Sequence, residues 1–297
     1  MSVHIGVNPI VWSNDDLHTL GGDIPLETCL AEARSAGYDG IELGHKFPRE
    51  DAALRAALAP HDLRLISGWY SARLLERSVE EELEAMQEHL DLLKALDCSV
   101  MVFAETSRCV HHEVTTPLAS RPIMTEGEWA RLCEGLDRVG QALWDQGVRL
   151  AYHHHMGTVV QTEAEVDRLM AETGPAVGLL LDTGHLAYAG SDALAVVRNH
   201  AGRVVHVHLK DVRREVVARA QAEGWPFLHA VLEGVFTVPG DGIIEYPPIM
   251  LALKSAGYGG WLVVEAEQDP LEATPLEYAR KGYEFSLALA ESSGLID

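Results

Sequence analysis

The chain has 297 residues, of which 47% are hydrophobic and 23% charged, and this composition is typical of a globular protein with a sizeable core. Its 45 acidic residues outnumber 23 Lys and Arg, and the formal net charge of -22 would repel a phosphate backbone, so we expect no nucleic-acid partner. No apolar run approaches the roughly 20 residues of a membrane span, and the N-terminus lacks a signal-peptide pattern, so we expect a cytoplasmic protein with no membrane association.

Eight short apolar segments predict β-strands. They span residues 4–8, 40–44, 63–69, 99–105, 148–155, 177–182, 203–210 and 261–265. The segments between most of them show helical periodicity, with acidic first turns and glycines at their ends. This alternation indicates βαβ units and a parallel sheet.

Eight such units in about 300 residues match a (β/α)8 TIM barrel of the α/β class. A doubly wound open sheet is the alternative, but the sequence has no GxGxxG after a strand and no GxxxxGK[ST]. We therefore expect one domain over residues 1–297, with an irregular insertion at about 212–242 after the seventh strand.

Polar side chains end four successive strands in the second half of the predicted barrel, where the active site of this fold lies. They are His153, Asp182, His208 and Glu265. Imidazoles and carboxylates without a thiolate suit Mn(II), Co(II), Fe(II) or Zn(II). The spacing therefore predicts a metal site, with a hydrogen-bonded polar core as the alternative.

Three histidines in a row occupy the end of the fifth predicted strand. Because strand side chains alternate between faces, His153 and His155 should share one face and His154 should point the other way. We expect His154 to make a structural hydrogen bond. By contrast, we expect His111 and His112 to be a solvated pair on a loop.

Several motifs together resemble the sugar phosphate isomerase/epimerase superfamily, which has a xylose isomerase-like TIM barrel. They are "LDTGH" (181–185), "HVHLKD" (206–211), "VPGDGII" (238–244) and "GWLVVEAEQDP" (260–270). Within it, the chain is similar to the inosose dehydratases through "GVNPIVWSNDD" (6–16), "GIELGHKFPRE" (40–50) and "YHHHMGTVVQT" (152–162).

The resemblance implies a divalent ion, Mn or Co, as a cofactor. It also suggests glutathione as a second cofactor. The superfamily holds its ion with Glu, Asp, His and Glu, so Asp182, His208 and Glu265 match and His153 stands where relatives have Glu. It also implies dehydration of a small polyol ketone, 2-keto-myo-inositol, to a trihydroxycyclohexane-1,2-dione in inositol catabolism. Barrels of this kind often dimerise, so a homodimer is a further expectation.

Dehydration beside a ketone requires proton transfers near the metal, and His155, Lys210 and His185 are the predicted catalytic residues. A hydroxyl-rich substrate also needs several donors and acceptors. The predicted substrate-binding residues are Asn14, Asp15, Lys46, Glu105 and Glu267.

Other functions remain open from the sequence. A keto-sugar epimerase or isomerase could use the same metal site in the same barrel. So could an enolate-forming lyase that acts on 3-dehydroshikimate or cleaves C-glycosides. A polyol-binding protein without catalysis is a different class. Epimerases of the superfamily usually keep Glu at the position of His153, which disfavours the first alternative.

Overall fold

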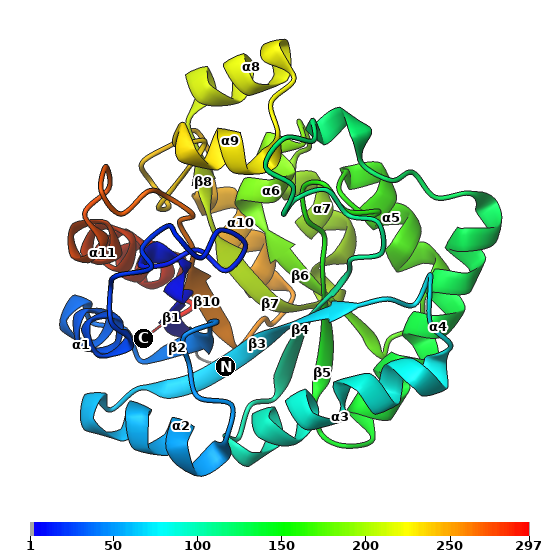
Figure 1. The fold of residues 1–297 in the computed structure, drawn as a ribbon, viewed down its shortest axis with the longest axis horizontal. Coiled ribbons are helices and arrows are strands. Elements are labelled where there is room, and N and C mark those ends of the chain that lie inside the picture. The colour runs from blue at the N-terminus through cyan, green and yellow to red at the C-terminus, as the bar shows by residue number, and fades with distance from the viewer. Residues whose placement is uncertain (1–2, 297) are drawn as a thin grey trace.

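Eight parallel strands close into a barrel in residues 3–296, the part of the chain that the computed structural model describes (Figure 1). The strands are β1 (His4–Val7), β2 (Gly40–Leu43), β3 (Arg64–Ala72), β4 (Val100–Glu105), β5 (Arg149–His153), β6 (Val177–Asp182), β7 (Val204–Leu209) and β10 (Trp261–Val264). Each pairs with its neighbours in chain order, and β10 closes on β1. The predicted TIM barrel is confirmed, and each predicted strand segment overlaps one barrel strand.

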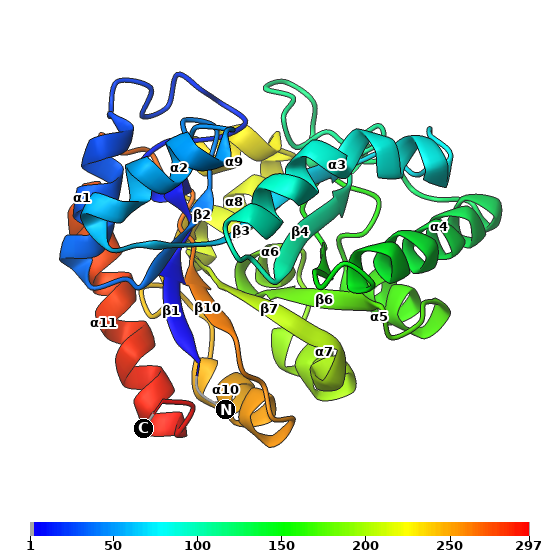
Figure 2. The same ribbon diagram turned by 90° about the horizontal axis from the view of Figure 1, so that it is seen from below.

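Helices surround the strands, as the view in Figure 2 shows. They are α1 (Leu26–Ala36), α2 (Asp51–Leu58), α3 (Val79–Ala95), α4 (Glu126–Trp144), α5 (Glu163–Glu172), α6 (Thr183–Tyr188), α7 (Ala193–His200), α10 (Tyr246–Ser255) and α11 (Pro275–Ser293). Three of them begin with capping boxes, at Ser78 and Glu81, Thr125 and Glu128, and Thr162 and Glu165. These residues fix the helix starts by satisfying free backbone N–H groups.

The segment at about 212–242 is more regular than the sequence suggested. It contains α8 (Arg214–Glu223) and α9 (Phe227–Leu232), and the short strands β8 (Asp211–Val212) and β9 (Phe236–Thr237) pair antiparallel. The Asp211 carboxylate accepts hydrogen bonds from the backbone N–H groups of Ile243 and Ile244. Phe227 and Phe236 pack in a small apolar cluster together with other residues of α8 and α9.

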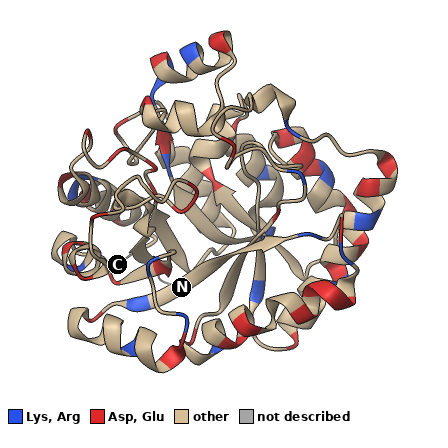
Figure 3. Cartoon of the chain, in the orientation of Figure 1, with Lys and Arg blue, Asp and Glu red and all other residues tan. Residues whose placement is uncertain are grey.

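Charged residues lie mostly on the helices and loops around the strands (Figure 3). The main apolar core fills the space between the strands and the helices. Inside the barrel, a smaller apolar cluster contains Val100, Val102, Ala151 and Leu180. In the described part of the chain, we find no helix with both the length and the apolar character needed to cross a membrane.

Arg203, just before β7, offers a test of how the barrel is stabilised. Its guanidinium donates to the carbonyl oxygens of Met170, Thr173, Gly174 and Val177 at 2.6–3.2 Å. We expect Arg203→Ala to lower the free energy of unfolding by about 1–3 kcal/mol, because the half-buried carbonyls lose a charged donor. Urea denaturation measures this. Arg214→Ala, on the exposed face of α8, is the control, and equal losses in the two variants would contradict the prediction.

Candidate metal centre and active site

Four buried side chains converge at the carboxyl ends of successive strands. His153 ends β5, Asp182 ends β6, His208 lies in β7 and Glu265 follows β10. Each offers one ligand atom, and these four atoms all lie within 4.8 Å of one another. The side chains are at most 8% exposed, so little water reaches them.

The atoms that face one another in this cluster lack hydrogen-bond partners. Asp182 Oδ2 lies 3.7 Å from His153 Nε2 and 3.6 Å from His208 Nδ1. Within residues 3–296, no hydrogen bond satisfies Asp182 Oδ2, His208 Nδ1 or Glu265 Oε2, although the last two are only 2.6 Å apart. Buried polar atoms are normally paired. Convergent unpaired nitrogen and oxygen donors fit a divalent transition-metal ion, which these four residues would hold.

Hydrogen bonds on the far side of each imidazole aim it at the cluster. His153 Nδ1 donates to the backbone carbonyl of His154 at 2.6 Å, which leaves Nε2 facing Asp182. His208 Nε2 lies 3.2 Å from Glu42 Oε2, which leaves Nδ1 facing the other ligands. Such outer contacts orient histidine ligands in metal sites and fix their tautomers.

Glu42, from β2, is the centre of this outer network. Its carboxylate accepts hydrogen bonds from Asn8 Nδ2 at 2.7 Å, Ser67 Oγ at 2.5 Å and His206 Nε2 at 2.8 Å. Burial opposes its ionisation, but the charges and hydrogen bonds of His208 and His206 outweigh burial and hold the pKa of Glu42 well below its usual range. Glu42 lies within the predicted strand 40–44, but the sequence pattern gave it no role.

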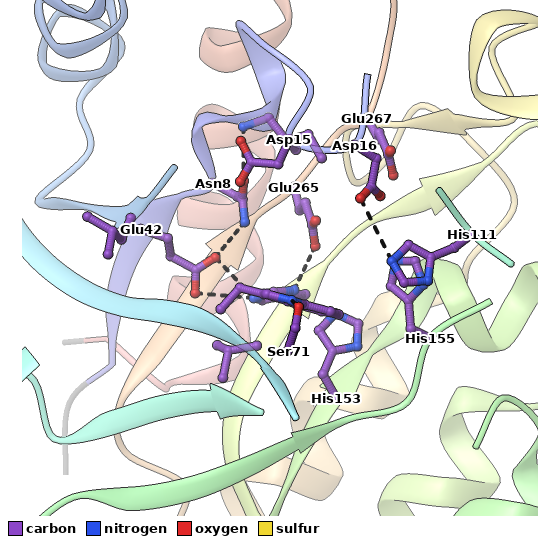
Figure 4. Close-up of a pocket in the computed structure, with 15 residues that line it drawn as sticks. Asn8, Asp15, Asp16, Glu42, Ser71, His111, His153, His155, Glu265 and Glu267 are labelled. Carbon is purple, nitrogen blue, oxygen red and sulfur yellow. Dashed lines mark hydrogen bonds and ion pairs between the residues drawn. The ribbon is translucent and has the colours of Figure 1, made fainter. Parts of the chain in front are cut away.

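A cavity of about 210 Å³ opens above the cluster (Figure 4). It is lined by Asn8, Ile10, Asp15, Asp16, Glu42, Leu43, Trp69, Ser71, Val102, His111, His153, His155, His208, Glu265 and Glu267. Most of these side chains can donate or accept a hydrogen bond, while Trp69 and the aliphatic residues supply apolar surface. This mixture suits a small ligand rich in hydroxyl groups.

His155 faces the cavity, whereas the other two predicted catalytic residues lie behind it. His155 Nδ1 donates to the Met156 carbonyl at 2.8 Å, so Nε2 is free to meet a ligand. The fully buried His185 packs against it, with ring centroids 3.9 Å apart. Lys210 Nζ is also fully buried, 3.2 Å from His185 Nε2 and 3.2 Å from Glu265 Oε1.

A glycine permits this close packing around Lys210. A Cβ atom at Gly184 would lie 2.5 Å from Cγ of Lys210. The glycine of the "LDTGH" segment therefore lets α6 approach the lysine, and the short helix begins with Asp182 Oδ1 accepting from the His185 N–H at 2.7 Å. The "LDTGH" segment thus supplies the predicted ligand Asp182, the glycine that lets α6 pack against Lys210, and the buried His185.

Comparison with known proteins identifies the family of the chain. The family model described as xylose isomerase-like TIM barrel matches residues 30–289. The chain belongs to this family. The inosose dehydratase of Geobacillus thermodenitrificans is 46% identical over 99% of this chain and 98% of its own length. The rhizopine catabolism protein MocC of Rhizobium meliloti is 50% identical over 99% of this chain and 90% of its own length. Within the family, the chain thus groups with the inosose dehydratases, as the motifs predicted.

Solved structures share the fold at low sequence identity. A structure described as the IOLI protein with a bound zinc atom has a TM-score of 0.71 and 16% identity, over 98% of this chain and 99% of that one. An L-ribulose 3-epimerase has a TM-score of 0.69 and 18% identity, over 98% of this chain and 95% of that one. Both support the xylose isomerase-like architecture.

The predicted substrate-binding residues of this family member separate into two groups. Asp15 and Glu267 line the cavity, and Asn14 Nδ2 donates to Glu267 Oε1 at 2.7 Å from behind. Lys46 Nζ instead donates to the carbonyls of Gly21, Gly22 and Ile24 at 2.6–3.2 Å. Glu105 accepts from the backbone N–H groups of Leu74 and Ser107 at 2.7 and 2.9 Å. Lys46 and Glu105 therefore organise loops around the cavity.

The expectation of a solvated His111 was wrong. His112 is exposed, but His111 is 6% exposed and lines the cavity. Its loop folds back over the barrel because the Val110 N–H donates to the carbonyl of Gly157 at 2.9 Å. Gly157 has a φ of 79°, a conformation that favours glycine.

His154 makes a structural hydrogen bond, as expected, and His206 has a similar supporting position. His154 is fully buried, and its Nε2 accepts from the Asp182 N–H at 3.3 Å. His206, also fully buried, contacts Glu42 from below. His154 therefore supports a residue of the cluster and His206 supports the outer network, and neither lines the cavity.

Glu42 gives a test of the outer network. We expect Glu42→Gln to weaken metal binding by about 10–100-fold, because an amide cannot hold His208 and His206 as a carboxylate does. Competition with a coloured chelator measures the affinity. Glu88→Gln, on the exposed face of α3, is the control. Unchanged affinity in a folded Glu42→Gln protein would contradict the proposed role.

Glu105 gives a test that separates a structural from a substrate-binding role. Burial raises the pKa of Glu105 from 4.5 to about 7, although hydrogen bonds from Ser107 and Leu74 oppose this. The carboxyl group of Glu105 therefore binds its proton more tightly in the folded state than in the unfolded state. The free energy of unfolding of the wild type should fall, relative to that of Glu105→Gln, as the pH rises from about 4.5 to about 7.

Urea denaturation of both proteins across that range measures the effect of Glu105. The KM for substrate should be unchanged in Glu105→Gln, since the carboxylate faces backbone N–H groups. A raised KM with a pH-independent stability difference would instead support the predicted contact with substrate.

Proposed function

We propose that the protein is an inosose dehydratase that removes water from 2-keto-myo-inositol and yields a trihydroxycyclohexane-1,2-dione. The observation that carries the proposal is the end-to-end match, at 46% identity, to a relative named inosose dehydratase. The buried cluster of His153, Asp182, His208 and Glu265 beneath a polar cavity supports it, because it supplies the donors that this chemistry needs.

The reaction removes a proton from the carbon beside the ketone and then expels a hydroxyl group as water. A divalent ion, which we propose to be Mn or Co, supplies Lewis-acid stabilisation of negative charge on the ketone oxygen when bound. The four residues of the cluster would bind and orient that ion. Glutathione, the second cofactor that the resemblance implies, is tested by including it in the assay or omitting it.

His155 is the residue that we assign to removal of the carbon-bound proton. It faces the cavity two residues beyond His153, and its Nδ1 is held by the Met156 carbonyl at 2.8 Å. A general base must reach the substrate through an uncommitted atom, and Nε2 of His155 meets that requirement.

Lys210 and His185 position other groups in this scheme. Lys210 Nζ contacts Glu265 Oε1 at 3.2 Å and lies 3.8 Å from Glu267 Oε2, so it fixes two carboxylates at the cavity wall. His185 supports the ring of His155 from behind, with centroids 3.9 Å apart. Neither side chain needs to touch the substrate for this role.

A direct assay distinguishes dehydration from epimerisation. The protein reconstituted with Mn or Co is incubated with 2-keto-myo-inositol, and loss of water is followed by mass spectrometry. We expect conversion to the dione with either ion. No conversion of the inosose, together with epimerisation of a ketohexose, would overturn the proposal in favour of the epimerase alternative.

The assignment of His155 predicts a separation of metal binding from turnover. His155→Gln should bind metal as the wild type does but reduce kcat by about 10²–10⁴-fold, the usual contribution of a general base. Metal analysis and steady-state kinetics on the same samples measure both. Asp182→Ala, in contrast, should lose the ion, and full activity in His155→Gln would remove this histidine from the mechanism.

A further inference from the structure

Asp16 and His111 form a second polar pair in the cavity, apart from the metal cluster. They lie on two different loops, after β1 and after β4, and Figure 4 shows them across the cavity from Glu42. His111 Nε2 is 3.8 Å from Asp16 Oδ1. Both side chains line the cavity, and His111 also lies beside His155, with ring centroids 4.8 Å apart.

The separation within this pair leaves a place for a hydroxyl group. At 3.8 Å the two atoms are too far apart for a direct hydrogen bond. A ligand hydroxyl beside both could accept from His111 Nε2 and donate to the Asp16 carboxylate. The other ring nitrogen, His111 Nδ1, is buried and has no hydrogen-bond partner in residues 3–296, so Nε2 is the atom available to a ligand.

Both members of the pair are held in place before a ligand arrives. Asn14 Oδ1 accepts from the Asp16 N–H at 2.8 Å, which fixes the first loop. Trp69 and Phe227 contact the His111 ring edge-on, with centroids 6.4 and 6.5 Å away. Such preorganisation is what a catalytic group requires, since little reorganisation remains for the reaction.

We propose that Asp16 and His111 bind the hydroxyl group that leaves the substrate, and that His111 gives it the proton with which it departs as water. This inference rests on the proposed dehydration. It divides the two proton transfers between two histidines, with His155 acting at carbon and His111 acting at the departing oxygen.

The step balances without an outside proton donor. The C–H bond breaks, and its proton passes to His155 while its electron pair forms the enolate. His155 then passes this proton to His111, whose ring is 4.8 Å away centre to centre. His111 transfers it to the hydroxyl oxygen as the C–O bond breaks. As the C=O bond re-forms, the electrons of the enolate make the new C=C bond and one water is released. Both imidazoles end neutral, and the enol that results tautomerises to the dione.

Exchange with heavy water tests this division of labour. The metal-loaded wild type, His111→Gln and His155→Gln are incubated with 2-keto-myo-inositol in D₂O, and deuterium in recovered substrate is measured beside water loss. In His111→Gln we expect water loss to fall by about 10²-fold or more while deuterium still enters the substrate, because the carbon proton is still removed. His155→Gln should lose both reactions.

His112→Gln is the matched control, because His112 is the exposed neighbour on the same loop. It should keep both reactions and the full metal content. Asp16→Asn is the second variant, and we expect it to uncouple exchange from water loss as His111→Gln does. A substrate analogue with fluoride in place of the departing hydroxyl should restore turnover to His111→Gln, since fluoride leaves without a proton.

The outcomes separate this inference from the proposed function. Normal water loss in folded, metal-loaded His111→Gln would overturn the inference and leave the dehydratase intact. Equal loss of exchange and elimination, with no rescue by the fluoro analogue, would also overturn it and assign His111 a role in binding. Failure of the wild type to dehydrate the inosose would overturn the proposed function itself.

Discussion

The buried carboxylate of Glu42 is the interaction on which the rest of the site depends. It links side chains that follow or lie in β1, β3 and β7, namely Asn8, Ser67, His206 and His208. A buried charge is costly unless hydrogen bonds and opposite charges surround it, and here they do. The result is a rigid floor to the cavity. His208 can present Nδ1 upwards only because Glu42 holds Nε2 from below.

The charges above this floor explain why the cluster suits a cation. Asp182, Glu265 and Glu267 are buried carboxyl groups, and Lys210 is the fully buried amine that contacts two of them. Burial raises the pKa of Glu267 to about 8, so this carboxyl group holds its own proton at neutral pH. One ammonium does not balance Asp182, Glu265 and Glu42, and, against the effect of burial, Glu42 and Glu265 raise the pKa of His208 well above its usual range. In proteins, buried excess charge is neutralised by protons or by a bound ion. Lys210 therefore stabilises the ligand set without replacing the ion that the set would hold.

Sequence patterns predicted the four-residue cluster, which strand ends position, but they misjudged several side chains whose surroundings depend on loops. Strand ends in a TIM barrel meet at one rim, so His153, Asp182, His208 and Glu265 could be brought together from spacing alone. His111 could not be placed, because its burial depends on a hydrogen bond between Val110 and Gly157 on another loop.

Dependence on loops also explains why the predicted substrate-binding roles of Lys46 and Glu105 do not match their contacts. Each has the chemistry of a substrate-binding group, but backbone groups of nearby loops occupy both side chains. Residue type alone does not reveal such contacts, because they depend on the path of the loops. For Glu42 the strand position was visible in the sequence, whereas two of its partners, His206 and His208, come from β7, more than 160 residues away along the chain.

His153 connects the ligand set to the division of catalytic work. A carboxylate at this position, as the superfamily resemblance implies for relatives, would give the ion a third negative ligand. With imidazole there, two carboxylates and two neutral rings face a dication, so more of its positive charge remains to polarise a ketone. His153 also commits its Nδ1 to the backbone and its Nε2 to the cluster. Proton transfer must then come from residues beyond the ligand set, and the cavity supplies His155 and His111 for it.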